Sequence, residues 1–439
     1  MHKIEIPNLK KIPTHFLVTA TAWISRGANI LVRIFTLPIL LRYLGIEQFA
    51  ILSIVLSLEG WFLLCDLGIG SALQNYLSEA RAKKEDIEPF LSAVTQSTLL
   101  LFIVFFGLLY FLNHHIQNWI FKDFTIEQTE LIFFVGSIYI FTAVGSIGYK
   151  ALYALQKGYW IHVLQAAGAI LSSSIAMMLP FIYHGEQKLV VVIAAMTIFP
   201  AFFACLAFYF LFLKRNPFRY LSWEPVKMIL KRGIGFGAFA LLSNVGLLVD
   251  YLIMARTLTA DQIASYHVLS KIFLSLFFLY NALLLAVWPK CSELLARNQW
   301  LEVTQIMKKY ILFGSILITI STLSVSMFST KISSVFFKSN EVIFSQSTIY
   351  LFGIYLLIRI VSDTYSTVFQ SMSYMKVFFI FVPAQVLLIV FAEYYLSLKF
   401  GIDGILWGLI GAFAVTVLWG LPYAFRMKKK RVLKSLGTF

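Results

Sequence analysis

Four basic side chains lie inside long apolar segments of this 439-residue chain: Arg26, Arg33, Lys271 and Arg359. A charge at the centre of a membrane-spanning helix costs about 2.5–3.5 kcal/mol, so four lipid-facing charges would cost on the order of 10 kcal/mol. That cost rivals the whole stability of a typical domain. We therefore expect these side chains to face a hydrated interior or to pair with acidic groups. A cavity lined by arginine and lysine suits an anion, and the planar guanidinium matches phosphate well.

Arg26 and Arg33 are seven residues apart, so on a helix they share one face. Small and polar residues recur on the same face: Thr19, Ala22, Asn29 and Thr36. The segment contains no acidic residue of its own, which leaves two interpretations open. The arginines line a cavity and bind an anionic head group, or they pair with acids of other helices. The candidate charge partners, which are also the candidate ion-coupling residues, are Glu59, Asp66, Asp250 and Asp363.

Several of these charges also have a purely structural interpretation. Arg359 and Asp363 are four residues apart, so they can neutralise each other on one helix. Asp66 ends its apolar segment and can orient the loop that follows. Glu393 lies near the outer end of its segment, and we expect it at the membrane interface.

The composition identifies an integral membrane protein, since 59% of the residues are hydrophobic and only 13% are charged. A soluble domain is about half apolar and about a quarter charged. The apolar segments lack the alternation of barrel strands, so we predict membrane-spanning helices. The twelve predicted spans are 16–41, 46–69, 91–112, 131–151, 160–183, 189–213, 234–255, 263–287, 310–329, 347–370, 377–397 and 405–424.

The distribution of lysine and arginine sets the predicted orientation. With both termini in the cytoplasm, the cytoplasmic segments hold 25 of these residues and the outer loops hold 7. This asymmetry is typical of a multi-pass protein of the plasma (inner) membrane. The net charge of +15 arises mainly from lysine and arginine in the cytoplasmic segments, as expected for membrane orientation, so we expect no nucleic-acid partner. The basic tail is instead expected to contact anionic lipid headgroups.

The two halves of the chain resemble each other. With an offset of 214 residues, LRYLGIEQFA (41–50) aligns with ARTLTADQIA (255–264), and SEARAKKEDIE (78–88) aligns with SELLARNQWLE (292–302). An even number of spans separates equivalent points, so the halves would be related by a pseudo-twofold axis along the membrane normal, as in many transporters. We predict an all-α fold of two six-helix lobes. The predicted parts are an N-terminal lobe (1–213), a cytoplasmic linker (214–233), a C-terminal lobe (234–424) and a basic cytoplasmic tail (425–439).

The motifs of common enzymes are missing from the sequence. It has no phosphate-binding loop ending in GK[ST], no HExxH and no nucleophile elbow. The three cysteines, Cys65, Cys205 and Cys291, show neither a metal-ligand spacing nor a disulfide pattern. We therefore expect no catalytic residues, no metal site and no bound cofactor.

The stretch LLRYLGIEQFAILSIVLSLEGWFLLCDLGIGSAL (40–73) carries a family resemblance. It is similar to the opening of the polysaccharide-exporter branch of the multidrug/oligosaccharidyl-lipid/polysaccharide (MOP) superfamily. The matching residues are Arg42, Leu44, Gly45, Phe49, Asp66, Gly68 and Ile69, whereas Ala50 replaces the usual glycine. Within that branch the chain most resembles the O-antigen flippases of the Wzx type.

The resemblance implies a MATE/MOP-like fold and a function. Such flippases move undecaprenyl-pyrophosphate-linked oligosaccharide units across the plasma membrane by alternating access, and the resemblance implies coupling to an H+ or Na+ gradient. The implied partners are the polyprenyl-pyrophosphate-linked oligosaccharide and membrane lipids, with a polysaccharide polymerase and chain-length proteins as further candidates. One alternative is a cation-coupled multidrug exporter of the same superfamily, which the basic excess within the spans disfavours. Another is an enzyme of glycan assembly, which the short loops disfavour.

Overall fold

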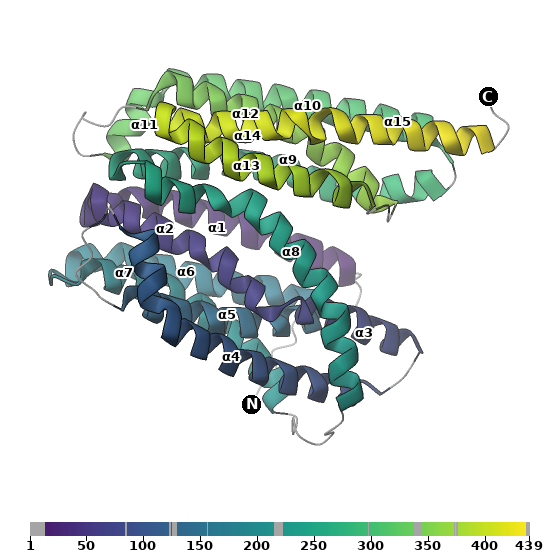
Figure 1. Cartoon of the computed structure of the whole chain (residues 1–439), viewed down its shortest axis with the longest axis horizontal. Helices are drawn as coiled ribbons and strands as arrows, with labels where there is room; N and C mark the ends of the chain where they lie inside the picture. Colours follow the sequence, from purple (N-terminus) through teal and green to yellow (C-terminus); the bar gives the residue numbers. More distant parts are fainter. Residues whose placement is uncertain are drawn as a thin grey trace, which may run out of the picture. The chain divides into compact units, whose positions relative to one another are not determined.

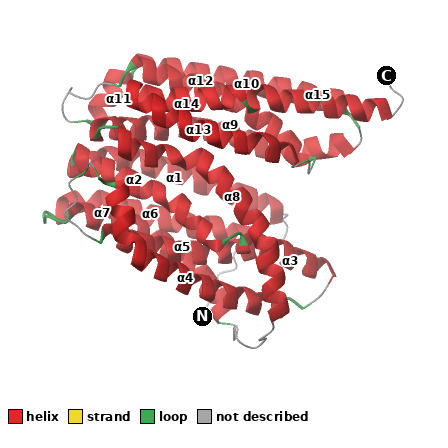
Figure 2. Cartoon of the chain, viewed as in Figure 1, coloured by secondary structure: helices red, strands yellow, loops and turns green. Residues whose placement is uncertain are grey.

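The structure is a computed structural model that describes residues 14–83, 86–122, 124, 130–155, 157–214, 223–296, 298–337, 344–372, 374 and 376–435. Within these ranges the chain is helical and contains no strand (Figure 1, Figure 2). The prediction of an all-α protein is confirmed.

The helices follow one another with short connections. Their bounds are α1 Thr14–Leu44, α2 Ile46–Phe62, α3 Ile69–Lys83, α4 Glu88–Ile120, α5 Leu131–Ala154, α6 Gly158–Ile182, α7 Lys188–Phe208, α8 Trp223–Thr257, α9 Ala260–Ala296, α10 Trp300–Met327, α11 Ser329–Phe336, α12 Gln346–Ser371, α13 Lys376–Phe400, α14 Ile402–Val415 and α15 Val417–Ser435. A 3-10 turn, η2 (Leu63–Asp66), extends α2, and a π-helical turn, η3 (Tyr209–Leu213), extends α7.

Eleven helical segments of the described chain are long and apolar enough to cross a membrane. The predicted first span lies within α1, in which Phe35–Leu44 form a shorter apolar segment. The predicted last span comprises α14 and α15, which are separated only at Thr416. About twelve crossings are therefore consistent with the helices observed.

Two regions that we predicted as connections are helical. Residues after position 69 form α3, because Leu73, Leu77 and Ala80 recur on one face and are buried. The predicted linker 214–233 overlaps α8, which begins at Trp223. Helix α8 has Glu224 in its first turn, where a negative charge is favoured by the helix dipole.

The chain forms two compact units, each with its own core. The first unit comprises residues 1–36, 58–119 and 126–241, and the second comprises 37–57, 120–125 and 242–439. In the first unit α5 packs against α3, α6 and α7. In the second unit α12 packs against α9, α10, α14 and α15, and α13 packs against α14 (Figure 1). The predicted lobe boundaries stay a prediction.

The residues of the family motif form turns and a helix-to-helix contact. Gly45, with φ +80°, ends α1, and its amide donates to the Leu41 carbonyl oxygen over 3.0 Å. In the last turn of α1, Arg42 Nη2 donates to the carbonyl oxygen of Val335 over 2.7 Å. That carbonyl lies in the last turn of α11, where a positive charge is favoured. The motif arginine thus fixes the end of α1 to α11.

Gly68 occupies a position that accepts only glycine. Its φ is +75°, and a Cβ there would lie 2.3 Å from the carbonyl oxygen of Gly233 and 2.6 Å from the amide nitrogen of Gly237. The missing side chain therefore lets the turn between η2 and α3 touch the backbone of α8.

Candidate functional site

Asp250 is the centre of a polar cluster in the second unit. It lies on α8 and is surrounded by donors. Tyr266 of α9 donates its hydroxyl to Asp250 Oδ2 over 2.7 Å, and the amide of Tyr251 donates to Oδ1 over 2.8 Å. Lys271, one α-helical turn beyond His267 on α9, lies close enough for its charge to act on the Asp250 carboxylate. Two hydrogen bonds and a nearby cation thus oppose the cost of burying the Asp250 carboxylate.

Arg359 of α12 lies in an aromatic cage and is neutralised on its own helix. Its Nη2 and Nε donate to Asp363 Oδ2 over 2.9 and 3.2 Å. The guanidinium also lies over the rings of Phe277 and Phe413, at 5.2 and 5.7 Å from their centroids. The structural interpretation of this pair is therefore confirmed: Asp363 supplies the counter-charge and the rings supply cation–π contacts. Whether Arg359 also binds substrate stays a prediction.

Tyr355 connects the two charged groups. Its hydroxyl accepts a hydrogen bond from Arg359 Nη1 over 3.0 Å, and the ring lies within electrostatic range of Asp250. On the other side of the cluster, the hydroxyl of Tyr251 and Nδ1 of His267 are 2.8 Å apart. Polar groups of α8, α9 and α12 thus lie within electrostatic range of one another in the second unit. Tyr355 lies four residues before Arg359, a helical spacing, whereas the hydroxyls of Tyr251 and Tyr266 bond to groups on another helix, which no spacing within one helix predicts.

Glu393 lies on α13 with 0% of its surface exposed. Its expected depth near the membrane interface stays a prediction, and the structure adds that the side chain is buried within the protein. Its carboxylate is close enough to Asp250 for the two charges to interact. A single acid in a strongly apolar segment was the available signal. The depth of a residue within its span does not predict whether other helices bury it.

The arginines of the first span lie on α1, in the part that belongs to the first unit. Because α1 is continuous from Thr14 to Leu44, the predicted common face of Arg26 and Arg33 is retained. Their side chains lie outside the described part of the structure. Asn29, between them on that face, has a buried Oδ1 with no hydrogen-bond partner among the described atoms. A buried amide oxygen of this kind is suited to bind water or a polar ligand.

Asp66 has a local structural role in the first unit. Its Oδ1 accepts a hydrogen bond from the amide of Gly68 over 2.7 Å, and Lys150 of α5 lies within electrostatic range. Asp66 therefore stabilises the turn between η2 and α3, as the structural interpretation predicted. Glu59 is half-buried on α2.

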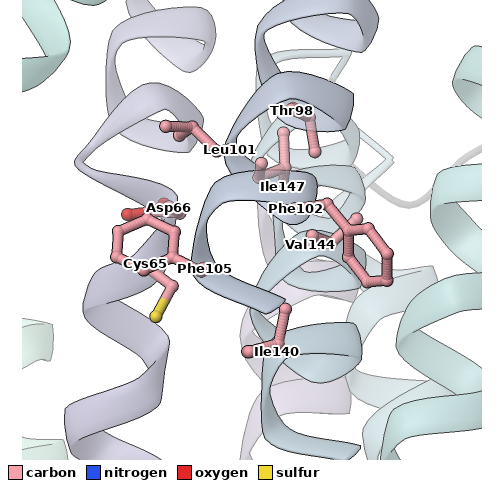
Figure 3. Close-up of a pocket in the computed structure, with 9 residues that line it drawn as sticks. All are labelled: Cys65, Asp66, Thr98, Leu101, Phe102, Phe105, Ile140, Val144 and Ile147. Atoms are coloured by element: carbon pink, nitrogen blue, oxygen red, sulfur yellow. The ribbon is translucent and has the colours of Figure 1, made fainter. Parts of the chain in front are cut away.

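A small, partly open hollow lies beside Asp66 (Figure 3). Helices α4 and α5 contribute most of its apolar wall. The lining residues are Cys65, Asp66, Thr98, Leu101, Phe102, Phe105, Ile140, Val144 and Ile147. None of them is basic, so this hollow does not suit an anionic head group.

The described residues contain no group of three or more histidine, cysteine, aspartate or glutamate side chains that could hold a metal ion.

Comparison with known proteins identifies relatives along the whole chain. Residues 19–295 match the family model described as polysaccharide biosynthesis protein. The chain is 32% identical over 434 residues to the "Putative O-antigen export protein" of Yersinia pseudotuberculosis, covering 97% of this chain and 99% of that one. It is 33% identical over 436 residues to the "Putative O-antigen transporter" of Salmonella typhimurium, covering 96% and 99%.

Solved structures with the same fold include two kinds of transport protein. An inward-facing multidrug resistance MATE family transporter of the MOP superfamily aligns with a TM-score of 0.76 at 14% identity, covering 92% of this chain and 96% of that one. The lipid II flippase MurJ, in an inward closed conformation, aligns with a TM-score of 0.74 at 16% identity, covering 94% and 89%. At these identities the likeness concerns the fold alone.

Proposed function

This chain belongs to the polysaccharide biosynthesis protein family, and we propose that it is a flippase for a lipid-linked oligosaccharide. Its substrate would be a polyprenyl-pyrophosphate-linked unit, such as an O-antigen repeat, moved from the inner to the outer leaflet. The observation that carries the proposal is the match of almost the whole chain to O-antigen export proteins. It is a transport protein of the membrane and not an enzyme.

The basic groups inside the spans supply what a pyrophosphate requires. Lys271 already balances an acid, and Arg359 is largely satisfied by Asp363. Arg26 and Arg33 have no acid on their own helix. We therefore assign the main contacts with the anionic head group to these two arginines, with Lys271 and Arg359 in support. A guanidinium binds two phosphate oxygens at once, which makes arginine better suited than lysine.

Several finer features belong to the same proposal. Transport would proceed by alternating access through a cationic cavity, coupled to an H+ or Na+ gradient. The protein would lie in the inner membrane with both termini in the cytoplasm, as the lysine and arginine distribution favours. It would deliver its product to a polysaccharide polymerase and chain-length proteins, because a flipped repeat unit is the substrate that such a polymerase needs.

The decisive experiment locates the lipid-linked repeat unit in a strain that lacks this protein. We expect repeat units to accumulate in the inner leaflet, out of reach of a membrane-impermeant glycosidase added to spheroplasts. Accumulation in the outer leaflet would contradict the proposal and indicate a role in assembly after flipping. Unchanged surface glycan together with new drug sensitivity would instead indicate a multidrug exporter.

Replacing both Arg26 and Arg33 with alanine tests the site. We expect surface glycan to fall at least tenfold, since about 1.5–3 kcal/mol is lost for each charged hydrogen bond and 1.4 kcal/mol is a factor of ten. The double lysine variant should retain part of the activity. Lys122→Ala, at an exposed position outside the spans, is the control for loss of a positive charge. Normal glycan in the double alanine variant at wild-type protein level would refute the assignment.

A further inference from the structure

Glu393 of α13 is fully buried in the second unit. None of its surface is exposed, and neither carboxylate oxygen has a hydrogen-bond partner among the described residues. Helix α14 packs directly against it, since a Cβ at Gly408 would lie 2.8 Å from Glu393 Cγ. An ionised carboxylate buried without a partner is far less stable than the neutral acid. The enclosure therefore favours the protonated form of Glu393.

Asp250 and Glu393 lie on two helices, α8 and α13, that touch each other. A Cβ at Gly246 would lie 3.2 Å from Val386 and 3.8 Å from Ile389, so these helices touch at a glycine. Asp250 is four residues beyond Gly246, and Glu393 is four residues beyond Ile389. Both acids therefore lie about one helical turn from the contact, on the faces that meet. The two acids lie within electrostatic range of each other.

The surrounding groups distinguish the two acids. Asp250 receives hydrogen bonds from the Tyr266 hydroxyl and the Tyr251 amide, and it feels the charge of Lys271. Glu393 lies within electrostatic range of Tyr266, but the Tyr266 hydroxyl donates its hydrogen bond to Asp250 and not to Glu393. Asp250 is thus the acid whose anion has donors and a cation beside it, and Glu393 is the acid that lacks them among the described residues.

The other elements around the pair add few charges. Helix α9 also presents His267, which is bonded to Tyr251. Helix α12 presents Tyr355 and Arg359, and Asp363 already balances that arginine. Helix α14 has no charged residue from position 404 to 415. Lys271 is therefore the one cation that acts on Asp250 among the groups described around it.

We propose that Glu393 and Asp250 form a buried proton-binding pair, and that this pair is the ion-coupling site of the transporter. The assignment of the pair as the ion-coupling site rests on the proposed function, which leaves the coupling ion open between H+ and Na+. The geometry favours the proton because Lys271 would repel a metal cation at Asp250, and because the hydroxyl hydrogen of Tyr266 points toward that acid. Two adjacent carboxyl groups bind a proton without needing a full shell of oxygen ligands.

The proton site can be tested without any transport. The purified full-length chain in lipid nanodiscs is titrated while infrared difference spectra follow carboxylic-acid carbonyl bands. We expect a protonated acid at pH 7 in the wild type, its loss in Glu393→Gln, and its retention in Asp261→Asn, an exposed acid of α9. Glutamine mimics the neutral acid, so the variant should unfold at the wild-type temperature or above. An unchanged band in Glu393→Gln would overturn the proposal.

Coupling is tested in proteoliposomes with a fluorescent lipid-linked oligosaccharide. Wild-type flipping should accelerate under an imposed pH gradient, and Glu393→Gln should lose that acceleration while keeping the rate without a gradient. Acceleration by a Na+ gradient alone would overturn the assignment to protons. A wild-type protein that does not flip the lipid would refute the proposed function, and the infrared result would still decide whether the proton site exists.

Discussion

Replacing Asp363 with asparagine should destabilise the protein by about 2–3 kcal/mol, because a largely buried guanidinium loses its counter-charge. Removing one partner of a fully buried ion pair costs about 3–5 kcal/mol. The side chains of Arg359 and Asp363 keep 15% and 24% of their surface exposed, so solvent screening places the expected loss below that range.

The remaining contacts of Arg359 also limit the loss. The Tyr355 hydroxyl still accepts a hydrogen bond, and the rings of Phe277 and Phe413 still face the guanidinium. Each cation–π contact contributes about 0.5–1 kcal/mol at a partly exposed position. The asparagine variant should therefore fold, and its unfolding can be measured.

A double-mutant cycle gives the interaction energy of the pair. The variants are Asp363→Asn, Arg359→Gln and the two combined, each unfolded by titration with a denaturing detergent from mixed micelles. We expect a coupling energy of about 2 kcal/mol, so that the double variant is more stable than the sum of the single effects implies. A coupling near zero, or an Asp363→Asn variant as stable as the wild type, would refute the reasoning. That result would mean that a hydrated interior, and not Asp363, balances the arginine.

Two further substitutions test the packing and the acid cluster. Gly68→Ala should lower the free energy of unfolding by more than about 2 kcal/mol, because the position has a left-handed backbone and a Cβ there would clash with α8. Gly107→Ala is the control and should be neutral or stabilising, because nothing lies within 4 Å of a Cβ at that position. Equal unfolding midpoints for the two variants would contradict the close contact of Gly68 with α8. Tyr266→Phe should cost about 1.5–3 kcal/mol by removing the hydrogen bond to the Asp250 carboxylate. Tyr395→Phe, at a position 62% exposed, is its control in the same unfolding assay, and a similar stability of both variants would show that the hydroxyl does not stabilise the anion.

The apolar pattern predicted most of the helices because burial in lipid requires long uninterrupted apolar segments. The same pattern missed α3, since a helix with one buried face and one polar face has too low a mean hydropathy to be counted as a span. The start of α8 at Trp223 was assigned to the linker for the same reason. Composition averages over both faces of such a helix, whereas folding depends on the buried face alone.

The contacts of the charged residues were likewise predictable only where both partners lie on one helix. The spacing of Arg359 and Asp363 was sufficient to suggest their pairing, because i and i+4 are neighbours on any helix. The burial of Glu393 could not be predicted in this way, since α8, α9 and α14 enclose it and their residues are distant in the sequence. The role of Asp66 in its turn depends on both local and distant contacts. Its hydrogen bond from the Gly68 amide is local in the sequence, but the contact with α8 is what requires a glycine at position 68.

The sequence by itself determined the membrane-spanning helices, the predicted orientation, the family motif and the one-sided polar face of α1. Each of these depends on composition or on neighbours within a few residues along the chain. The tertiary structure alone decided that two hydrogen bonds and Lys271 face the Asp250 carboxyl group, and that Glu393 is a buried acid without a hydrogen-bond partner among the described residues. Which charges meet in the interior depends on how α8, α9, α12 and α13 pack, and helix periodicity does not specify that packing.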